Sequence, residues 1–247
     1  MATIIEKQDH KVIYRDGDKL IKEFDNTFTK AEVLNEALNN ARVEETGLKI
    51  PKLLDVKKTE NGWAITREYI EGETLSDLMK KNPEKADEYL EKFVDLQLEI
   101  HAKKAPHLNK IKDKMHAKIS ASGYDATIRF DLHNRLEGMK KHTKVLHGDF
   151  CPANVLVTPD GEYYITDWSH ATQGNASADA ARTYLVFTLQ GKKDEAEKYL
   201  DLFCKKADIP KQLVWQWMPI VACSQSTKNI EGEKELLDSW VNVFDFQ

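Results

Sequence analysis

Two side chains with oxygen ligands, Asn154 and Asp167, border a short β-rich stretch of the chain, and a third, Asp149, precedes it by five residues. An amide oxygen beside a carboxylate suits Mg²⁺, which proteins hold with few side chains together with the phosphates of a substrate. The pattern therefore indicates chemistry on phosphate groups. Polar residues at the mouth of a hairpin are also common without any function, so the pattern alone leaves both interpretations open.

The two metal-ligand candidates depend on a predicted hairpin. Asp160-Gly161 between β-forming residues is a strong hairpin signal, and a two-residue loop there would place Asn154 opposite Asp167. Directly opposed residues share a face of the sheet, with Cβ atoms about 4.5–5.5 Å apart. The flanking β-rich runs are 154–158 and 163–167.

The elements upstream are mostly predicted strands. One helix interrupts them, with Thr29 and Glu32 forming a capping box at its start and Gly47 ending it. Alternating or continuous β-forming residues predict five strands, at 3–5, 11–14, 19–24, 53–56 and 63–70.

Two charged residues in this region allow alternative interpretations. Lys22 lies on the third predicted strand and, from composition alone, is typical of a solvated surface lysine. Glu36 lies on the predicted helix and is not explained by the cap. It is either a solvated helix residue or turned inward toward Lys22.

Helical periodicity dominates the rest of the chain. Thr74 or Ser76 can cap a short helix through Lys80, and Pro83 opens a long one that ends near Lys103. Further helices are predicted at 111–120, 125–141, 177–190, 193–207, 211–226 and 231–243.

Composition excludes several classes of protein. The chain has 247 residues and a net charge of −5, whereas nucleic-acid-binding proteins are usually basic. Its three cysteines are far apart and form no zinc spacing, which favours a reducing, cytoplasmic compartment. No apolar run approaches the ~18 residues of a membrane span. We expect no nucleic-acid or membrane partner, and a monomer or weak homodimer.

The stretch around the predicted hairpin resembles a known catalytic core. The run 147–149 (His-Gly-Asp), Asn154 and the pair 167–168 (Asp-Trp) are similar to the aminoglycoside phosphotransferase and choline kinase-like family. The five-residue step from Asp149 to Asn154 is also that of the protein-kinase catalytic loop. The resemblance implies an α+β, two-lobed protein kinase-like fold. Its small five-stranded antiparallel N-lobe would carry one helix, and its larger, mainly helical C-lobe would contain the short catalytic hairpin.

The resemblance extends beyond this loop. Lys22 and Glu36 fall on the expected strand and helix, 68–72 is similar to the hinge, and Asp179 is similar to the helix aspartate that braces the catalytic loop. It implies a nucleotide-binding lobe at 1–70 and a helical catalytic and substrate-binding lobe at 71–247, with the hinge at about 68–76.

Catalytic and metal-binding roles follow from the resemblance. Asp149 would accept the proton of the attacking hydroxyl, while Asn154 and Asp167 would hold Mg²⁺ on the nucleotide phosphates. Asp179 would accept hydrogen bonds from backbone N–H groups of the loop.

The resemblance also implies a nucleotide site for ATP, or GTP in its place. Lys22, held by Glu36, would contact the α- and β-phosphates, and the backbone of Glu68 and Ile70 would bind the adenine. One departure from the family is the loop at 6–10, which has no glycine, so that phosphate contacts there would come from Lys7, Gln8 or His10.

The acceptor is the least determined part. The acceptor expected is a small molecule with a hydroxyl group. Four acidic residues close to the C-terminus, with Asp131 and Glu137, could line a groove for a cationic acceptor such as an aminoglycoside, an amino sugar or an amino alcohol; a solvated helix face is the alternative. The four are Glu231, Glu233, Glu235 and Asp238.

Two other functions remain as alternatives. The glycine-less loop allows a nucleotide-binding pseudokinase or regulatory module without turnover, although the retained Lys22, Asp149, Asn154 and Asp167 disfavour it. A kinase acting on Ser/Thr is disfavoured by the short segment between Asp167 and Asp179 and by the absence of an Ala-Pro-Glu motif.

Overall fold

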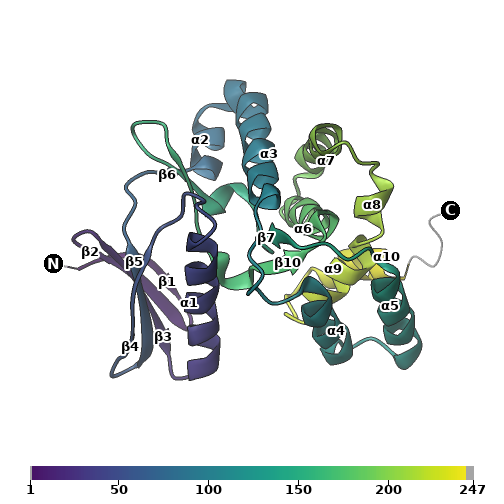
Figure 1. The fold of residues 1–247 in the computed structure, drawn as a ribbon, viewed down its shortest axis with the longest axis horizontal. Coiled ribbons are helices and arrows are strands. Elements are labelled where there is room, and N and C mark those ends of the chain that lie inside the picture. Colours follow the sequence, from purple (N-terminus) through teal and green to yellow (C-terminus); the bar gives the residue numbers. More distant parts are fainter. Residues whose placement is uncertain (1, 243–247) are drawn as a thin grey trace. The chain divides into compact units, whose positions relative to one another are not determined.

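The computed structural model describes residues 2–242 (Figure 1). The chain forms two compact units, one made of residues up to 86 together with 152–170, and the other of 87–151 together with residues from 171 onward. The hairpin segment thus groups with the N-terminal strands, whereas the sequence analysis placed it in a lobe spanning 71–247. The assignment of functional lobes at 1–70 and 71–247 stays a prediction.

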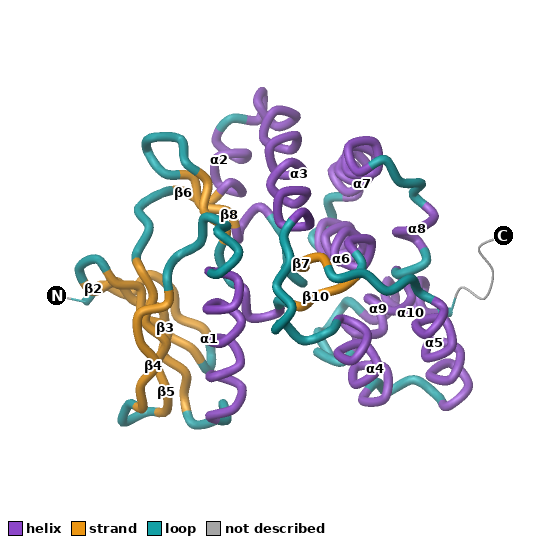
Figure 2. Tube along the Cα trace, viewed as in Figure 1, coloured by secondary structure: helices purple, strands orange, loops and turns teal. Residues whose placement is uncertain are grey.

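A five-stranded antiparallel sheet forms most of the first unit, in the order β1-β2-β3-β5-β4 (Figure 2). All five strands predicted from the sequence are present, and the expected five-stranded sheet is confirmed. Their bounds are β1 Thr3–Gln8, β2 Lys11–Asp16, β3 Lys19–Asp25, β4 Leu53–Lys58 and β5 Gly62–Glu68.

Helix α1, Lys30–Glu44, lies beside the sheet and contacts β4 and β5. Its capping box is present as predicted, since the Thr29 side chain accepts from the Glu32 N–H and Glu32 reaches back to the Thr29 N–H. Helix and sheet bury a small apolar cluster between them, made of Phe24, Val33, Ala37 and Ile65.

The hairpin at 152–170 has a different register from the predicted one. Leu156 pairs with Tyr164, so Asn154 lies opposite Thr166 and not opposite Asp167. The loop is the cause. Thr158 accepts a backbone hydrogen bond from Gly161, whose φ is +83°, which makes Pro159-Asp160-Gly161 a three-residue loop. The strands of this small sheet are β6 Glu73–Thr74, β8 Val155–Val157 and β9 Tyr163–Ile165.

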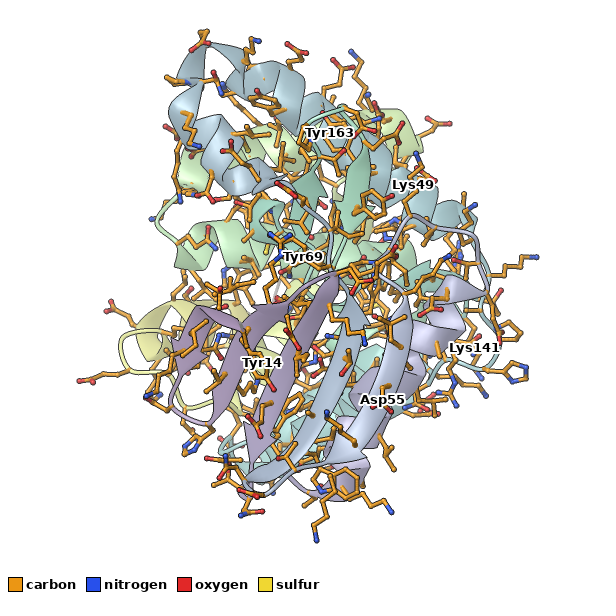
Figure 3. All side chains as sticks on the ribbon, turned by 90° about the vertical axis from the view of Figure 1, so that its left-hand side faces the viewer. Tyr14, Lys49, Asp55, Tyr69, Lys141 and Tyr163 are labelled. Atoms are coloured by element: carbon orange, nitrogen blue, oxygen red, sulfur yellow. The ribbon has the colours of Figure 1, made fainter. Side chains whose placement is uncertain are left out.

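The first unit also contains a short helix and three 3-10 turns. Thr74, not Ser76, caps α2 by accepting a hydrogen bond from the Asp77 N–H. The elements are α2 Leu75–Lys81, η1 Pro83–Lys85, η2 Pro152–Asn154 and η3 Trp168–His170. Figure 3 shows Tyr14 on the five-stranded sheet and Tyr69 at the end of that sheet.

The second unit is mainly helical, as expected for the larger lobe. Its helices are α3 Ala86–Ala102, α4 Ile111–Ala121, α5 Ala126–Gly138, α6 Ala176–Leu189, α7 Lys193–Ala207, α8 Gln212–Trp215, α9 Met218–Ser226 and α10 Lys234–Val241. Two short strands that the sequence did not indicate, β7 Lys144–Leu146 and β10 Thr172–Gly174, form a separate antiparallel pair.

Four predicted helices have different bounds. The long helix predicted to open at Pro83 begins at Ala86, after the 3-10 turn η1. The helix expected at 211–226 is split into α8 and α9, with Pro219 in the first turn of α9. The helix expected at 125–141 ends at Gly138, and that expected at 231–243 begins only at Lys234; Val243 lies outside the described residues. Across residues 2–242 no helix is long and apolar enough to cross a membrane.

Candidate active site

Lys22 and Glu36 form a buried ion pair. The Lys22 Nζ atom lies 2.9 and 3.1 Å from the two carboxylate oxygens of Glu36, and the residues are only 9% and 7% exposed. The prediction that Glu36 turns inward toward Lys22 is confirmed, and the interpretation of Lys22 as a solvated lysine is wrong. On β3, Lys22 shares a face with Phe24, so it points toward α1.

Arg67 is a third member of this cluster that the sequence analysis missed. Its Nη2 atom donates to Glu36 Oε1 at 2.8 Å, so one carboxylate holds two cations. The Nε atom of Arg67 is buried and has no hydrogen-bond partner among the described residues. The feature that could have indicated Arg67 is its position on β5, because the strand register places Arg67 beside Leu20 of β3.

The electrostatics of the cluster favour an ionised Glu36. Burial alone would raise the pKa of this carboxyl, but the charges of Lys22 and Arg67 outweigh that effect and hold the pKa below its ordinary value. Asp167 lies near enough for its negative charge to raise the pKa slightly. Asp167, a candidate metal ligand, therefore lies close to the ion pair of Lys22 and Glu36.

One cavity of the first unit contains most of the predicted nucleotide and metal residues. It has a volume of about 1050 Å³, at the upper end of the range for small-molecule sites. Five of the predicted residues line it, namely Lys22, Glu68, Ile70, Asn154 and Asp167, together with Arg67. Glu36 does not line the cavity, but it binds the ammonium group of Lys22, which does.

The hinge segment offers backbone groups to this cavity. The N–H of Glu68 donates to the Lys52 carbonyl and that of Tyr69 to the Asp18 carbonyl, both within 2.9 Å. A contact of Glu68 with a base would therefore use its carbonyl oxygen. The Tyr69 ring, which also lines the cavity, is covered by the Arg15 guanidinium at 4.0 Å from its centroid.

Asn154 and Asp167 both line the cavity although they are not opposed in the hairpin. Asp167 has a φ of +56°, a left-handed conformation that is uncommon outside glycine and recurs at functional sites. The next residues are anchored, because the Trp168 indole donates to the Ile165 carbonyl and the Asn39 amide to the Ser169 carbonyl.

The glycine-less loop contributes a different residue from those expected. Of Lys7, Gln8 and His10, only Gln8 lines the cavity, and His10 is hydrogen-bonded to Asp25 at 2.9 Å. Lys11, which the sequence analysis did not consider, also lines it.

Asp149 belongs to the second unit, on a loop that Asp179 braces. The two Asp179 oxygens accept hydrogen bonds from the N–H groups of His147 (3.2 Å) and Gly148 (2.7 Å), which confirms the predicted contacts. Burial would raise the Asp179 pKa, but the hydrogen bond and charge of His101 dominate and the pKa is lowered.

The Asp149 carboxylate is held by an arginine that the sequence analysis did not assign. Arg182 Nη2 donates to Asp149 Oδ1 at 2.9 Å, and Nη1 donates to Gln225 Oε1 at 2.8 Å. Gln225 in turn donates to Glu233 at 2.7 Å. The sequence could have indicated Arg182, because it follows Asp179 by three residues and therefore lies on the same face of α6.

The acidic residues suggested for a cationic acceptor mostly have partners of their own. Glu233 accepts from Gln225, and Asp238 accepts from the Tyr124 hydroxyl at 2.9 Å. Asp131 pairs with Arg135 and Glu137 with His116. Glu231 and Asp238 line a small cavity of about 370 Å³, together with Lys234, and Asp131 and Glu137 do not.

Fold and site together define a class of protein. The five-stranded lobe with its Lys–Glu pair, the helical lobe and the braced His-Gly-Asp loop are features of the kinase-like phosphotransferases. A phosphotransferase enzyme family model (APH) matches residues 6–213, so the chain belongs to this family. The recognition made from the sequence is confirmed, and with it the prediction of an enzyme of the small-molecule kinase type. Among curated proteins, none matches the chain significantly.

Solved structures show the same fold at low sequence identity. A thermostable mutant of aminoglycoside phosphotransferase APH(4)-Ia, in a ternary complex with ADP and hygromycin B, has a TM-score of 0.69 and 14% identity, covering 98% of this chain and 90% of that one. Choline kinase LicA from Streptococcus pneumoniae has a TM-score of 0.65 and 16% identity, covering 98% and 93%. The same LicA has been solved with AMP. The predicted fold class is confirmed.

Proposed function

We propose that the protein transfers the γ-phosphate of ATP to a hydroxyl group of a small molecule. The observation that carries this proposal is that five predicted residues line the same cavity, namely Lys22, Glu68, Ile70, Asn154 and Asp167. In this proposal Lys22, fixed by Glu36, binds the α- and β-phosphates, and the backbone of Glu68 and Ile70 binds the base. GTP is an alternative donor, because backbone groups can bind either purine.

The residues at the mouth of the hairpin fit a magnesium ion. Asn154 and Asp167 offer an amide oxygen and a carboxylate to the same cavity, which is the donor set that Mg²⁺ accepts alongside phosphates. Residues 2–242 contain no group of three or more His, Cys, Asp or Glu side chains suited to a metal, so a site completed by substrate oxygens is the appropriate type. When bound, Mg²⁺ would neutralise charge on the phosphates.

In the proposed reaction, the acceptor oxygen forms a bond to the γ-phosphorus and the bond from that phosphorus to the β–γ bridging oxygen breaks. ADP leaves with that oxygen, and the hydroxyl proton passes to Asp149. The acidic residues 231–238 suggested a cationic acceptor, such as an aminoglycoside, amino sugar or amino alcohol, and this class must be included in any acceptor test.

The test is ADP release from ATP and Mg²⁺ with a panel of hydroxylated acceptors, comparing wild type with Asp149→Asn and with the exposed control Asp194→Asn. We expect acceptor-dependent ADP release, reduced about 10²–10⁴-fold in Asp149→Asn and unchanged in the control. The proposal fails if no acceptor raises ADP release above the basal rate. Thermal stabilisation by ATP and Mg²⁺ without turnover would then favour the regulatory module.

A further inference from the structure

Arg182, Lys114 and Lys228 lie near Asp149 within the second unit, and Lys118 lies near both of these lysines. Arg182 forms the ion pair described above. Lys114 lies close enough to Asp149, Arg182 and Lys118 for their charges to act on its pKa. Lys228 is likewise within electrostatic range of Arg182 and Lys118, and of the carboxylates of Asp149 and Glu233. The carboxylate that would serve as the base therefore lies in a group in which basic side chains outnumber acidic ones.

Three helices bring these cations together. Lys114 and Lys118 lie one turn apart on α4, Arg182 lies on α6, and Lys228 follows the end of α9. Helix α9 packs against both α4 and α6, as Figures 1 and 2 also show. Like charges four residues apart on a helix repel each other. A bound anion close to these side chains would reduce the repulsion that the nearby carboxylates leave.

The carboxylates nearby are already engaged elsewhere. Asp179 accepts from the loop N–H groups and His101, and Glu233 accepts from Gln225. Lys118 donates to the Thr227 hydroxyl at 3.2 Å, and within residues 2–242 neither Lys118 nor Lys228 forms an ion pair. The ammonium groups of Lys118 and Lys228 are thus not directly paired with a carboxylate of the described residues.

The pKa values of two lysines in this group, Lys114 and Lys228, are lowered. Burial, followed by the charges of Lys118 and Arg182, lowers the pKa of Lys114 to about 8. Desolvation of its ammonium group and the charge of Arg182 likewise lower the pKa of Lys228. A bound anion would reverse both effects, because it stabilises the charged form of each lysine.

We propose that the acceptor is a hydroxylated anion, whose carboxylate or phosphate-ester group is bound by Lys118, Lys228 and Arg182 while its hydroxyl faces Asp149. This inference rests on the proposed phosphotransfer and names the acceptor class for it. A cationic acceptor would be repelled by the same residues. Electrostatic complementarity of this kind selects against the wrong charge as strongly as it favours the right one.

The first test measures anion binding without turnover. Inorganic phosphate and gluconate are titrated by calorimetry into wild type, the double variant Lys118→Glu/Lys228→Glu, and Lys193→Glu/Lys205→Glu. This second double variant changes two exposed lysines of α7 and is a charge-matched control. We expect both anions to bind about tenfold more weakly to the double variant, and unchanged binding to the control. Equal binding to all three proteins, or binding to none, overturns the inference. Binding of phosphate without gluconate would assign the site to phosphate esters.

The second test compares acceptors that share a carbon skeleton and differ in charge. Gluconate and glucose 6-phosphate are anionic, glucose is neutral and glucosamine is cationic; choline and an aminoglycoside extend the cationic arm. We expect turnover with the anions, with a KM that rises with ionic strength. Turnover confined to neutral or cationic acceptors overturns the inference. Absence of turnover with every acceptor overturns the proposed function, while the calorimetric result still decides the anion site.

A third measurement separates the acceptor from the nucleotide, whose phosphates are also anionic. The affinity for ATP is measured in the same double variant and in Lys118→Arg/Lys228→Arg. We expect the arginine variant to restore anion binding and the double glutamate variant to keep its ATP affinity within about twofold. An equal loss for ATP and for gluconate would show that the cations serve the nucleotide, and the acceptor assignment would be wrong.

Discussion

Arg182 holds Asp149 through one carboxylate oxygen, with 2.9 Å between Nη2 and Oδ1. The other arm of the same guanidinium donates to Gln225, which is itself tied to Glu233. The two side chains of the pair are 15% and 27% exposed, so the contact is largely shielded from solvent. Arg182 therefore fixes the orientation of the proposed base, and it is in turn fixed by residues from the C-terminal helices.

This relationship predicts different effects for two substitutions of Arg182. Arg182→Ala should lower kcat about tenfold to a hundredfold, because a misoriented catalytic group loses its alignment with the hydroxyl. Compared with Arg182→Ala, Arg182→Lys should bring the acceptor KM closer to the wild-type value than it brings kcat. A lysine keeps the positive charge but cannot hold Asp149 and Gln225 together. Steady-state kinetics separates the two parameters, and thermal unfolding checks that both variants fold. An unchanged kcat in Arg182→Ala would show that Arg182 does not position Asp149.

Glu36→Gln tests the buried charge cluster. The substitution leaves Lys22 and Arg67 without a counter-charge in a site where both are mostly buried. We expect a loss of about 3–5 kcal/mol in unfolding free energy, measured by urea denaturation at neutral pH, and a weaker affinity for ATP. Glu45→Gln, at the exposed end of the same helix, should stay within about 0.5 kcal/mol of wild type. Equal stability of both variants would contradict the role given to Glu36.

The same carboxylate predicts a pH dependence of stability. The pKa of Glu36 is lower in the folded protein than its ordinary value, because Lys22 and Arg67 outweigh burial. Its stabilising contribution is therefore complete above the ordinary glutamate pKa and is lost as the pH falls through the folded value. The difference in unfolding free energy between wild type and Glu36→Gln should shrink as the pH falls below about 5. A difference that grows on acidification would reverse the assigned sign.

Gly72 is predicted to tolerate no side chain. A Cβ atom at this position would lie 2.6 Å from the Val157 carbonyl oxygen, which is backbone and cannot move aside cheaply. Gly72→Ala should destabilise the protein by about 1–3 kcal/mol. The matched control is Gly138→Ala at the end of α5, where a Cβ meets nothing within 4 Å. Thermal melts of the two variants compare them directly, and equal midpoints would disprove the steric argument.

Local sequence signals were sufficient for much of the fold. The capping box of α1 and the five strands follow from residues a few positions apart, and these were predicted correctly. The pairing of Lys22 with Glu36 could be suspected from sequence because each lies on an element with a clear pattern. The hairpin register was wrong, because Asp160-Gly161 supports two loop lengths, and the hydrogen bond from Gly161 to Thr158 selects the longer one.

Other parts of the site depend on packing between distant segments, which local patterns do not encode. Arg67 contacts Glu36 across 31 positions, and Arg182 contacts Gln225 across 43. The cations around Asp149 come from three helices that are far apart in sequence. Judged one by one, these lysines are indistinguishable from solvated surface residues, so the sequence directed attention to the acidic residues near the C-terminus instead.

The pKa of Lys114 provides a further test of the anionic acceptor. Burial, then the charges of Lys118 and Arg182, lower this pKa to about 8, although Asp179 and Asp149 oppose the shift. Lys114 therefore loses its charge as the pH rises above about 8, and attraction for an anion weakens. We expect the KM for an anionic acceptor to rise over this range in wild type. Lys114→Arg should abolish the rise, because a guanidinium stays charged there.

The same group has a separate effect on stability, and its sign is fixed. In the unfolded chain Lys114 keeps its proton up to about pH 10.4, so between about pH 8 and that value the unfolded state binds more protons than the folded state. The unfolding free energy of wild type relative to Lys114→Met should therefore increase with pH in this window, while the acceptor KM also increases. Tighter acceptor binding at high pH would contradict the attraction, because a cationic acceptor, and not an anionic one, gains from the loss of a positive charge.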